Sequence, residues 1–267
     1  MKKIIVLSII VCNITNTVAQ SPYQLAWKTD GIIAAGILGL TASDILLNRS
    51  LDPLTEDQVL ALDPSQINRF DRWASRQNSS AAGFRSDIGQ NAPIIASLGT
   101  LLLYPSISNN EVPWVSEFAI LATLFLEINL VNSGITDIVK ASVKRPRPYT
   151  YDPERSLESK LSKNTRKSFF SGHTSASAAN SYFLARVFSD YYPESKWKPA
   201  VWGLAVMIPA WTGLERVLAG KHFPTDVIAG YIVGASCGIL IPHIHKMKTD
   251  GIELSFTGNG LILAYTF

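Results

Sequence analysis

Six apolar segments dominate the sequence and constrain the fold more than any other feature. None of them alternates apolar with polar residues as a half-buried strand does, so each is predicted to form a helix. The segments cover residues 30–47, 92–104, 115–139, 174–188, 200–218 and 226–243. The sequence therefore predicts an all-α protein built on a six-helix bundle.

The last of these segments has the strongest membrane character. It reads VIAGYIVGASCGILIP, has no charge and contains small residues that allow helices to pack closely. Several other segments are shorter than the ~20 residues that a perpendicular span needs. The third segment also contains Glu117, Glu127, Asn129 and Asn132. We expect a membrane-embedded bundle, and a soluble bundle stays open as the alternative.

The regions outside the bundle define the expected domain boundaries. Residues 1–20 combine a basic pair, an apolar stretch and the ending TVA, which is the pattern of a secretory signal peptide, with an uncleaved anchor as the alternative. The polar residues 51–90 are expected on the surface. Near the other end, Asn259-Gly260 between two apolar runs predicts a β-hairpin. The expected domains are a signal peptide (1–20), a helical domain (21–248) and a hairpin tail (249–267).

Charge and cysteine content exclude several classes of protein. The 24 Lys and Arg residues against 21 Asp and Glu residues give a net charge of +3, too small and too dispersed for a general nucleic-acid binder. Cys12 lies in the predicted signal peptide and Cys237 stands alone in an apolar run, so no disulfide framework or Cys-based zinc site is expected. His243 and His245 supply only two metal ligands and are interpreted as structural or exposed, and no metal site is assigned.

Three polar clusters lie at predicted helix ends, and the first follows the third apolar segment. It reads KASVKRPRP over residues 140–148, where two prolines end the helix and hold Arg147 in extended backbone. The guanidinium of Arg147 and the point charge of Lys140 together suit a phosphate. Taken alone, such a cluster is more often a solvated basic helix end or a positive-inside flank than a phosphate site.

The second cluster is Phe170-Ser171-Gly172-His173, directly before the fourth segment. Gly172 lets a ligand approach the backbone closely, and Ser171 with the free N–H groups of the helix start can donate to an anion. His173 stands beside them as a candidate proton donor. An ordinary Ser/Thr helix cap is the alternative for this cluster.

The third cluster runs from Glu215 to Asp226, between the last two segments. Pro224 argues against a continuous helix, so His222 is expected in a loop with Asp226 at or near a helix N-terminus. A carboxylate bonded to one imidazole nitrogen fixes the tautomer and leaves the other nitrogen free to attack. We therefore expect the Asp226 carboxylate to bond His222.

The three clusters form one pattern: Lys, six residues, Arg-Pro; then Ser-Gly-His; then Arg, five residues, His, three residues, Asp. This pattern resembles the type 2 phosphatidic acid phosphatase (PAP2) superfamily, which includes the vanadate-dependent haloperoxidases. The surrounding helical segments are similar to the family's six-helix core. The family usually has Pro at Phe170 and Ser at Glu215, so loop shape and substrate access are in doubt, and Glu215 is expected to weaken the positive field beside Arg216.

The resemblance implies metal-independent hydrolysis of a phosphate ester, with no cofactor. It implies that His222 attacks phosphorus, Asp226 orients it and His173 protonates the leaving oxygen. Lys144, Arg145 and Lys221 are expected to matter less. The implied phosphate ligands are Lys140, Arg147, Ser171, Gly172 and Arg216.

The expected function is hydrolysis of a lipid phosphate monoester or pyrophosphate in a bacterial cell envelope. The partners are then a phosphorylated lipid and the membrane, without nucleic acid. Two alternatives stay open: a soluble periplasmic, class A-like acid phosphatase for small phosphomonoesters, and a non-catalytic phospholipid-binding envelope protein. We expect the active site to face the periplasm. A cleaved signal peptide followed by six spans would instead place the three clusters on the cytoplasmic side, so these two expectations conflict.

Overall fold

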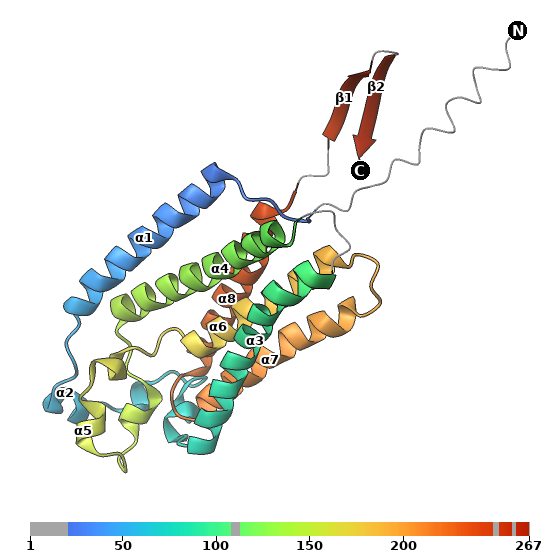
Figure 1. The fold of residues 1–267 in the computed structure, drawn as a ribbon. Helices are drawn as coiled ribbons and strands as arrows, with labels where there is room; N and C mark the ends of the chain where they lie inside the picture. Colours follow the sequence, from blue (N-terminus) through green and yellow to red (C-terminus); the bar gives the residue numbers. More distant parts are fainter. Residues whose placement is uncertain (1–20, 108–112, 248–250, 258–259, 267) are drawn as a thin grey trace, which may run out of the picture.

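The computed structural model describes residues 21–107, 113–247, 251–257 and 260–266 (Figure 1). Within these residues, six long helices form the body, which confirms the all-α prediction, and each contains or closely matches one predicted segment. The helix that contains the second predicted segment begins at Ser80, well before residue 92, where that segment was expected to start. The long helices are α1 (Trp27–Arg49), α3 (Ser80–Ile107), α4 (Trp114–Val143), α6 (Gly172–Tyr191), α7 (Lys198–Leu218) and α8 (Pro224–His245).

Short helical elements fill the connections at one end of the body. The α1–α3 connection holds α2 (Glu56–Leu60), and the α4–α6 connection holds α5 (Leu157–Lys160). Four 3₁₀ turns accompany them: η1 (Pro64–Gln66), η2 (Arg72–Arg76), η3 (Pro148–Tyr151) and η4 (Lys163–Arg166). The expectation that residues 51–90 lie on the surface is wrong in part, because Asp71, Ala74 and Ser75 are buried.

Helix α6 lies at the centre of the bundle, packed against α3, α4, α7 and α8, while α1 packs on α4. An apolar cluster lies between these helices, and buried polar side chains such as Asn132 and Asn180 accompany it. Leu121, Leu124 and Ile128 of α4 contribute to it, together with Phe183 of α6 and Ile241 of α8.

Glycines of α8 bring its backbone close to that of α6. A Cβ atom on Gly230 would lie 2.5 Å from the carbonyl oxygen of Ser171, and Cβ atoms on Gly234 and Gly238 would collide with carbonyl oxygens one and two turns farther along α6. The predicted role of these small residues in close helix packing is therefore confirmed. This packing fixes the N-terminus of α6 against that of α8.

Three of the helices, α1, α4 and α8, are long and apolar enough to cross a membrane. Helix α1 has no buried residue, and large apolar side chains such as Ile32, Leu38 and Leu46 are exposed along it. Such a surface is costly in water and is suited to a lipid environment. These features support the prediction of a membrane-embedded bundle.

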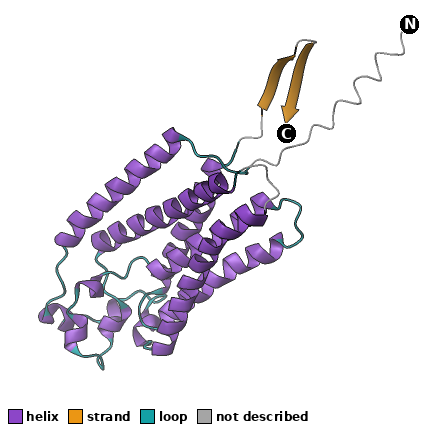
Figure 2. Ribbon diagram, in the orientation of Figure 1, coloured by secondary structure: helices purple, strands orange, loops and turns teal. Residues whose placement is uncertain are grey.

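Two antiparallel strands follow α8 in the chain (Figure 2). They are β1 (Gly251–Thr257) and β2 (Gly260–Thr266), with Gly251 opposite Thr266 and Thr257 opposite Gly260. The predicted turn includes Asn259, which lies outside the described residues. The predicted signal peptide over residues 1–20 also lies outside them.

Candidate active site

The three polar clusters of the sequence meet at one end of the bundle, next to α2 and α5 (Figure 1). Lys140 comes from the last turn of α4 and Arg216 from the last turn of α7. Ser171 caps the N-terminus of α6, and Asp226 lies in the first turn of α8. The Ser171 backbone N–H donates to the carbonyl oxygen of Asp226 at 3.0 Å, which joins the last two helix starts.

His222 is buried in the loop between α7 and α8, with 1% of its surface exposed. Its Nδ1 lies 2.7 Å from the Ser168 carbonyl oxygen, which can only accept, so Nδ1 carries the proton and Nε2 keeps a lone pair in the neutral ring. Burial lowers the pKa of His222 well below its usual value, and the positive charges of Arg147, Arg216 and Lys140 lower it further. His222 is thus neutral at neutral pH, as a nucleophile must be.

Asp226 does not bond His222 directly, so that part of the prediction is wrong. Its Oδ2 lies 3.8 Å from Nδ1 of His222, beyond hydrogen-bond distance. The same oxygen accepts from the Ser168 hydroxyl at 2.5 Å and from the Phe223 N–H at 2.9 Å. The reason is that α8 starts at Pro224, and the Asp226 carboxylate in its first turn reaches back to the N–H of the N-cap residue Phe223. Asp226 therefore acts on His222 through Ser168, which holds the imidazole.

Arg145, which was expected to matter little, bridges two buried carboxylates. Its guanidinium donates to Asp226 at 2.5 Å, to the Thr225 hydroxyl at 2.8 Å and to Asp71 at 2.8 Å. Burial alone would raise the pKa of Asp71, but hydrogen bonds from Thr225, Arg145 and Asn68 hold it below its ordinary value. The start of α8 is fixed by this network, and sequence reasoning missed both Arg145 and Asp71.

The hydrogen bonds of the two motif arginines go to neutral oxygen atoms, and in the part of the chain that the structure describes a carboxylate approaches only Arg216, at 3.9 Å from Asp87. Arg147 donates from Nε to the Asn164 carbonyl and from Nη2 to the Asn164 side chain, both at 3.0 Å. Arg216 donates to the Ser86 hydroxyl at 3.3 Å, and its buried Nε has no hydrogen-bond partner among the described residues. Both side chains are more than nine-tenths buried. Such buried positive charge favours the binding of an anion.

Lys140 and Gly172 lie side by side at the N-terminus of α6. A Cβ atom on Gly172 would lie 2.8 Å from Nζ of Lys140, so glycine is what allows this ammonium group to approach the helix start. Ser171 is the N-cap, and its hydroxyl accepts from the Thr174 N–H. The Lys140 ammonium group and the free N–H groups at the start of the 20-residue helix α6 therefore both place positive charge beside Gly172.

His173 is partly exposed and has a partner that the sequence did not indicate. Its Nε2 lies 2.9 Å from Oδ1 of Asp87, a residue of α3. The same carboxylate oxygen lies 3.9 Å from Nη1 of Arg216. Burial and the positive charge of Arg216 lower the pKa of His173 to about 4, and Asp87 opposes this shift while it orients the imidazole.

The expected effect of Glu215 on the positive field is wrong. The Glu215 carboxylate receives two hydrogen bonds from Arg85 of α3, at 2.9 and 2.8 Å, so its charge is paired away from Arg216. Lys144 takes the left-handed C-cap position of α4, at φ 53°. The Lys221 ammonium group lies over the ring of Tyr149, 5.2 Å from its centre.

A comparison with protein families points to the same group of residues. A sequence model described as the PAP2 superfamily matches residues 119–250, a range that contains all nine positions of the motif pattern. Residues 119–250 belong to the PAP2 superfamily. The match covers 132 of the 267 residues and confirms the resemblance seen in the motifs.

Known relatives of this PAP2 domain include two named phosphatases. The undecaprenyl-diphosphatase of Sulfolobus acidocaldarius is 29% identical over 162 residues, covering 57% of this chain and 73% of the relative. The lipid A 1-phosphatase of Rhizobium johnstonii is 30% identical over 145 residues, covering 49% of this chain and about half, 54%, of the relative. A transmembrane PAP2-type phosphatidylglycerolphosphate phosphatase structure from Bacillus subtilis is 20% identical, with a TM-score of 0.44 and coverage of 82% and 92% of the two chains.

Proposed function

We propose that this PAP2 phosphatase hydrolyses a lipid phosphate monoester or diphosphate through a phosphohistidine formed on His222. One observation carries the proposal. The imidazole is buried and neutral, its Nδ1 proton is held by the Ser168 carbonyl, and its Nε2 lone pair is left for attack. Three basic side chains act on this ring: Lys140, Arg147 and Arg216.

In the first step, Nε2 of His222 forms a bond to phosphorus and the bond from phosphorus to the leaving oxygen breaks. The electron pair goes to that oxygen, which takes a proton from His173. In our proposal the negative charge of the bound phosphate raises the lowered pKa of His173, so that the imidazole carries the proton it donates. In the second step, His173 accepts a proton from water as the water oxygen attacks phosphorus. The N–P bond then breaks and releases inorganic phosphate, which restores both histidines.

The positive charge that this reaction needs comes from the protein itself. Charge develops on the equatorial oxygens of phosphorus as the bond to the leaving group breaks. Lys140, Arg147 and Arg216 bind these oxygens in our proposal, together with the Ser171 hydroxyl and the Gly172 N–H. Hydrolysis is accordingly expected to proceed without a metal ion at the phosphate.

A lipid is the proposed substrate because the body offers so much exposed apolar surface. The candidate spans α1, α4 and α8 would place the site at the end of a membrane-embedded bundle, where a lipid headgroup lies. The names of the two relatives, undecaprenyl-diphosphatase and lipid A 1-phosphatase, support a phosphorylated lipid. A soluble phosphatase would expose α1 to water along its whole length, which disfavours that alternative.

We further propose that residues 21–248 are the catalytic domain of an envelope protein, and that its site faces the periplasm. Among the described residues the opposite end carries the lysines Lys28, Lys196, Lys198 and Lys246, whereas the loops at the site end are richer in Lys and Arg, so charge alone favours a cytoplasmic site and the proposed orientation follows the family resemblance instead. Residues 249–267 are then a tail outside the catalytic unit.

Phosphate release by the purified protein tests this function. The assay compares a diacyl phosphate in detergent micelles with a small soluble phosphomonoester, both with EDTA present, beside the variant His222→Ala. We expect release mainly from the lipid and a loss of about 10⁴-fold or more in the variant, as for removal of a covalent nucleophile. Preference for the soluble ester would overturn the substrate class, and equal release by the variant would overturn the mechanism.

The covalent intermediate gives a second readout. Labelling with a lipid carrying ³²P in its phosphate, followed by rapid denaturation at alkaline pH, is expected to leave label on the wild-type chain and none on His222→Ala. A label that persists in the variant would place the nucleophile elsewhere. Absence of both label and turnover would favour the non-catalytic lipid-binding alternative.

A further inference from the structure

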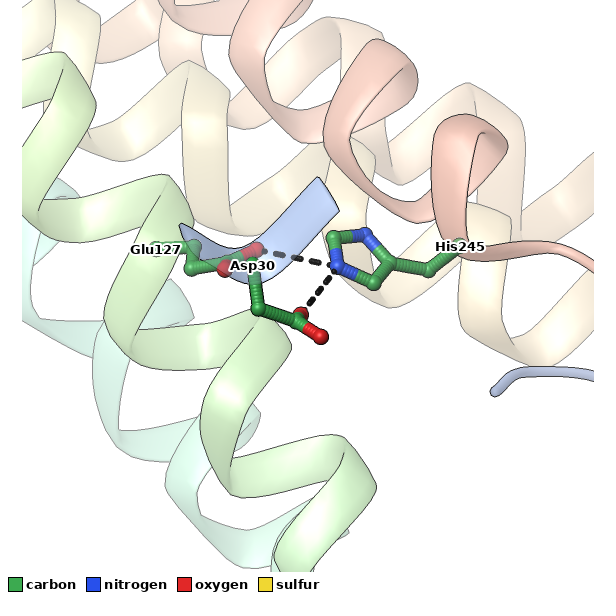
Figure 3. A group of neighbouring side chains, drawn as sticks. All are labelled: Asp30, Glu127 and His245. Carbon is green, nitrogen blue, oxygen red and sulfur yellow. Dashed lines mark hydrogen bonds and ion pairs between the residues drawn. The ribbon is translucent and has the colours of Figure 1, made fainter. Parts of the chain in front are cut away.

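Three ionisable side chains converge at the end of the bundle opposite the phosphate site (Figure 3). Asp30 comes from the first turn of α1, Glu127 from α4 and His245 from the last turn of α8. Nε2 of His245 lies 2.9 Å from Oδ1 of Asp30 and 3.3 Å from Oε2 of Glu127. Because α8 rises 1.5 Å per residue, the cluster lies about 30 Å from the start of α8 and from His222.

The hydrogen bonds around the cluster leave one imidazole nitrogen and two carboxylate oxygens facing one another. Nδ1 of His245 donates to the Ile241 carbonyl oxygen at 2.9 Å, so Nε2 of the neutral ring presents a lone pair to the two carboxylates. The second oxygen of Asp30 is already used, since it accepts from the Ala26 N–H at 2.6 Å. Oε2 of Glu127 has no hydrogen-bond partner among the described residues, and this side chain is 8% exposed.

We propose that Asp30, Glu127 and His245 bind one divalent transition-metal ion, with Zn²⁺ as the best fit. One imidazole nitrogen and two carboxylate oxygens form a three-ligand set that zinc accepts, with water as the fourth ligand. Bonds of 2.0–2.1 Å in a tetrahedron separate neighbouring ligand atoms by about 3.3 Å, close to two of the separations seen here. The ion also neutralises the negative charges of the partly exposed Asp30 and the buried Glu127.

The surroundings of the cluster fit this assignment. A ligating histidine commonly donates its other N–H to a backbone carbonyl, as His245 does to Ile241. A cavity of about 310 Å³ adjoins the cluster, lined by residues that include Gln24, Thr29 and Lys246. It provides a route for the ion and room for a water ligand.

The ion would have a structural role, because the cluster is remote from the phosphate site. Helix α1 has no buried residue and packs on α4. A metal shared by α1, α4 and α8 would fasten the start of α1 to the body. This inference does not depend on the proposed phosphatase activity.

Metal binding by the full chain in detergent, with no affinity tag, tests the proposal. Titration with Zn²⁺ alone is expected to give one bound ion per chain and to raise Tm by about 5 °C at 100-fold excess over Kd. Co²⁺ is expected to give the visible absorption of a tetrahedral site. Asp30→Asn and Glu127→Gln are expected to weaken binding by more than the roughly 10–100-fold that loss of an outer-shell partner costs. His243→Gln, an exposed histidine two residues from His245, is the matched control and is expected to bind like the wild type.

Several outcomes would overturn the proposal. A wild-type chain that binds no Zn²⁺ would show that a proton, rather than a metal, joins the three side chains. Equal binding by Glu127→Gln and the wild type would place any bound ion elsewhere. If the substitutions prevent folding, the wild-type protein still decides the question, because addition of EDTA must lower Tm while leaving phosphate release unchanged.

Discussion

The chemistry proposed for His222 depends on residues that hold its protonation state and orientation. Ser168 joins the two halves of this arrangement, since its carbonyl accepts from His222 and its hydroxyl donates to Asp226. Arg145 then fixes Asp226 from the other side. The nucleophile is therefore positioned by a chain of contacts that begins outside the motif residues.

Replacement of Arg145 tests this chain of contacts. Arg145→Ala leaves the carboxylates of Asp71 and Asp226 buried without a cationic partner, and both have 0% of their side chains exposed. Removing one partner of a buried ion pair costs about 3 kcal/mol or more, so we expect a lower Tm and lower phosphatase activity. Lys144→Ala is the matched control and is expected to change stability by less than about 0.5 kcal/mol. Equal Tm values for the two variants would contradict the positioning role of Arg145.

The depressed pKa of His222 predicts how stability depends on pH. Above about pH 6.5 the ring is neutral in both folded and unfolded chains and contributes no dependence. Below that pH the unfolded chain binds a proton that the folded chain resists, so stability falls by up to about 1.4 kcal/mol per pH unit. Thermal unfolding between pH 5 and 7.5 checks this. We expect a shallower dependence for His222→Gln, and identical slopes would show that His222 does not carry the effect.

The residues that sequence reasoning missed share a physical cause. Lys140, Arg147, Gly172 and His222 were predictable because they belong to motifs at helix ends. Asp71, Asp87 and Arg85 lie in residues 51–107, where no motif spacing marks them. Their partners Thr225, His173 and Glu215 are 154, 86 and 130 positions away, so only the folded chain brings them together.

At the scale of elements, the close packing of α6 and α8 sets the geometry of the site. The glycines of α8 were predictable from the apolar segment, since small residues at every fourth position allow helices to approach. Which helix they contact was not, because the sequence does not order the helices around the core. The contact with α6 matters for activity, because Gly230 packs directly against the carbonyl group of Ser171.

Gly230→Ala tests this contact. Its new Cβ atom would lie 2.5 Å from the Ser171 carbonyl oxygen, and a backbone atom cannot move aside as the end of a side chain can. We expect a cost of about 1–3 kcal/mol and a loss of activity as the start of α6 shifts. Gly203→Ala in α7 is the matched control, since nothing lies within 4 Å of its Cβ atom. It is expected to gain up to about 1 kcal/mol from helix propensity. Unchanged Tm and phosphate release in Gly230→Ala would contradict the packing argument.

At the scale of the whole molecule, the two ends of the bundle are chemically distinct. One end gathers positive charge for a phosphate, and the other joins two carboxylates and an imidazole. The histidine of the second cluster was visible in the sequence, but Asp30 and Glu127 lie 215 and 118 residues from His245, so no ligand spacing could reveal them. Helix α1 runs from one end to the other. Just before it, the Gln24 N–H donates to the His245 carbonyl oxygen, and near its last residue the Asn48 carbonyl oxygen accepts from the Lys163 ammonium group at the site end.

This course of α1 links membrane orientation to the fate of residues 1–20. If α1 crosses the membrane, Ser21 and the phosphate site lie on opposite sides. A cleaved signal peptide would release Ser21 outside and place the site inside, so it is incompatible with the periplasmic site that we propose. The side of the membrane on which the phosphate site lies therefore decides between a cleaved signal peptide and a periplasmic site. With the site outside, residues 1–20 remain on the cytoplasmic side.

Single cysteines in a chain without Cys12 and Cys237 measure this orientation. Glu158→Cys reports the site end and Lys196→Cys the opposite end, and both positions are exposed. In cells with a permeable outer envelope, a membrane-impermeant thiol reagent is expected to label Glu158→Cys directly and Lys196→Cys only after the inner membrane is opened. The reverse pattern would place the site in the cytoplasm and restore the cleaved signal peptide. Labelling of both without opening the membrane would mean that α1 does not span, because its two ends would then lie on one side.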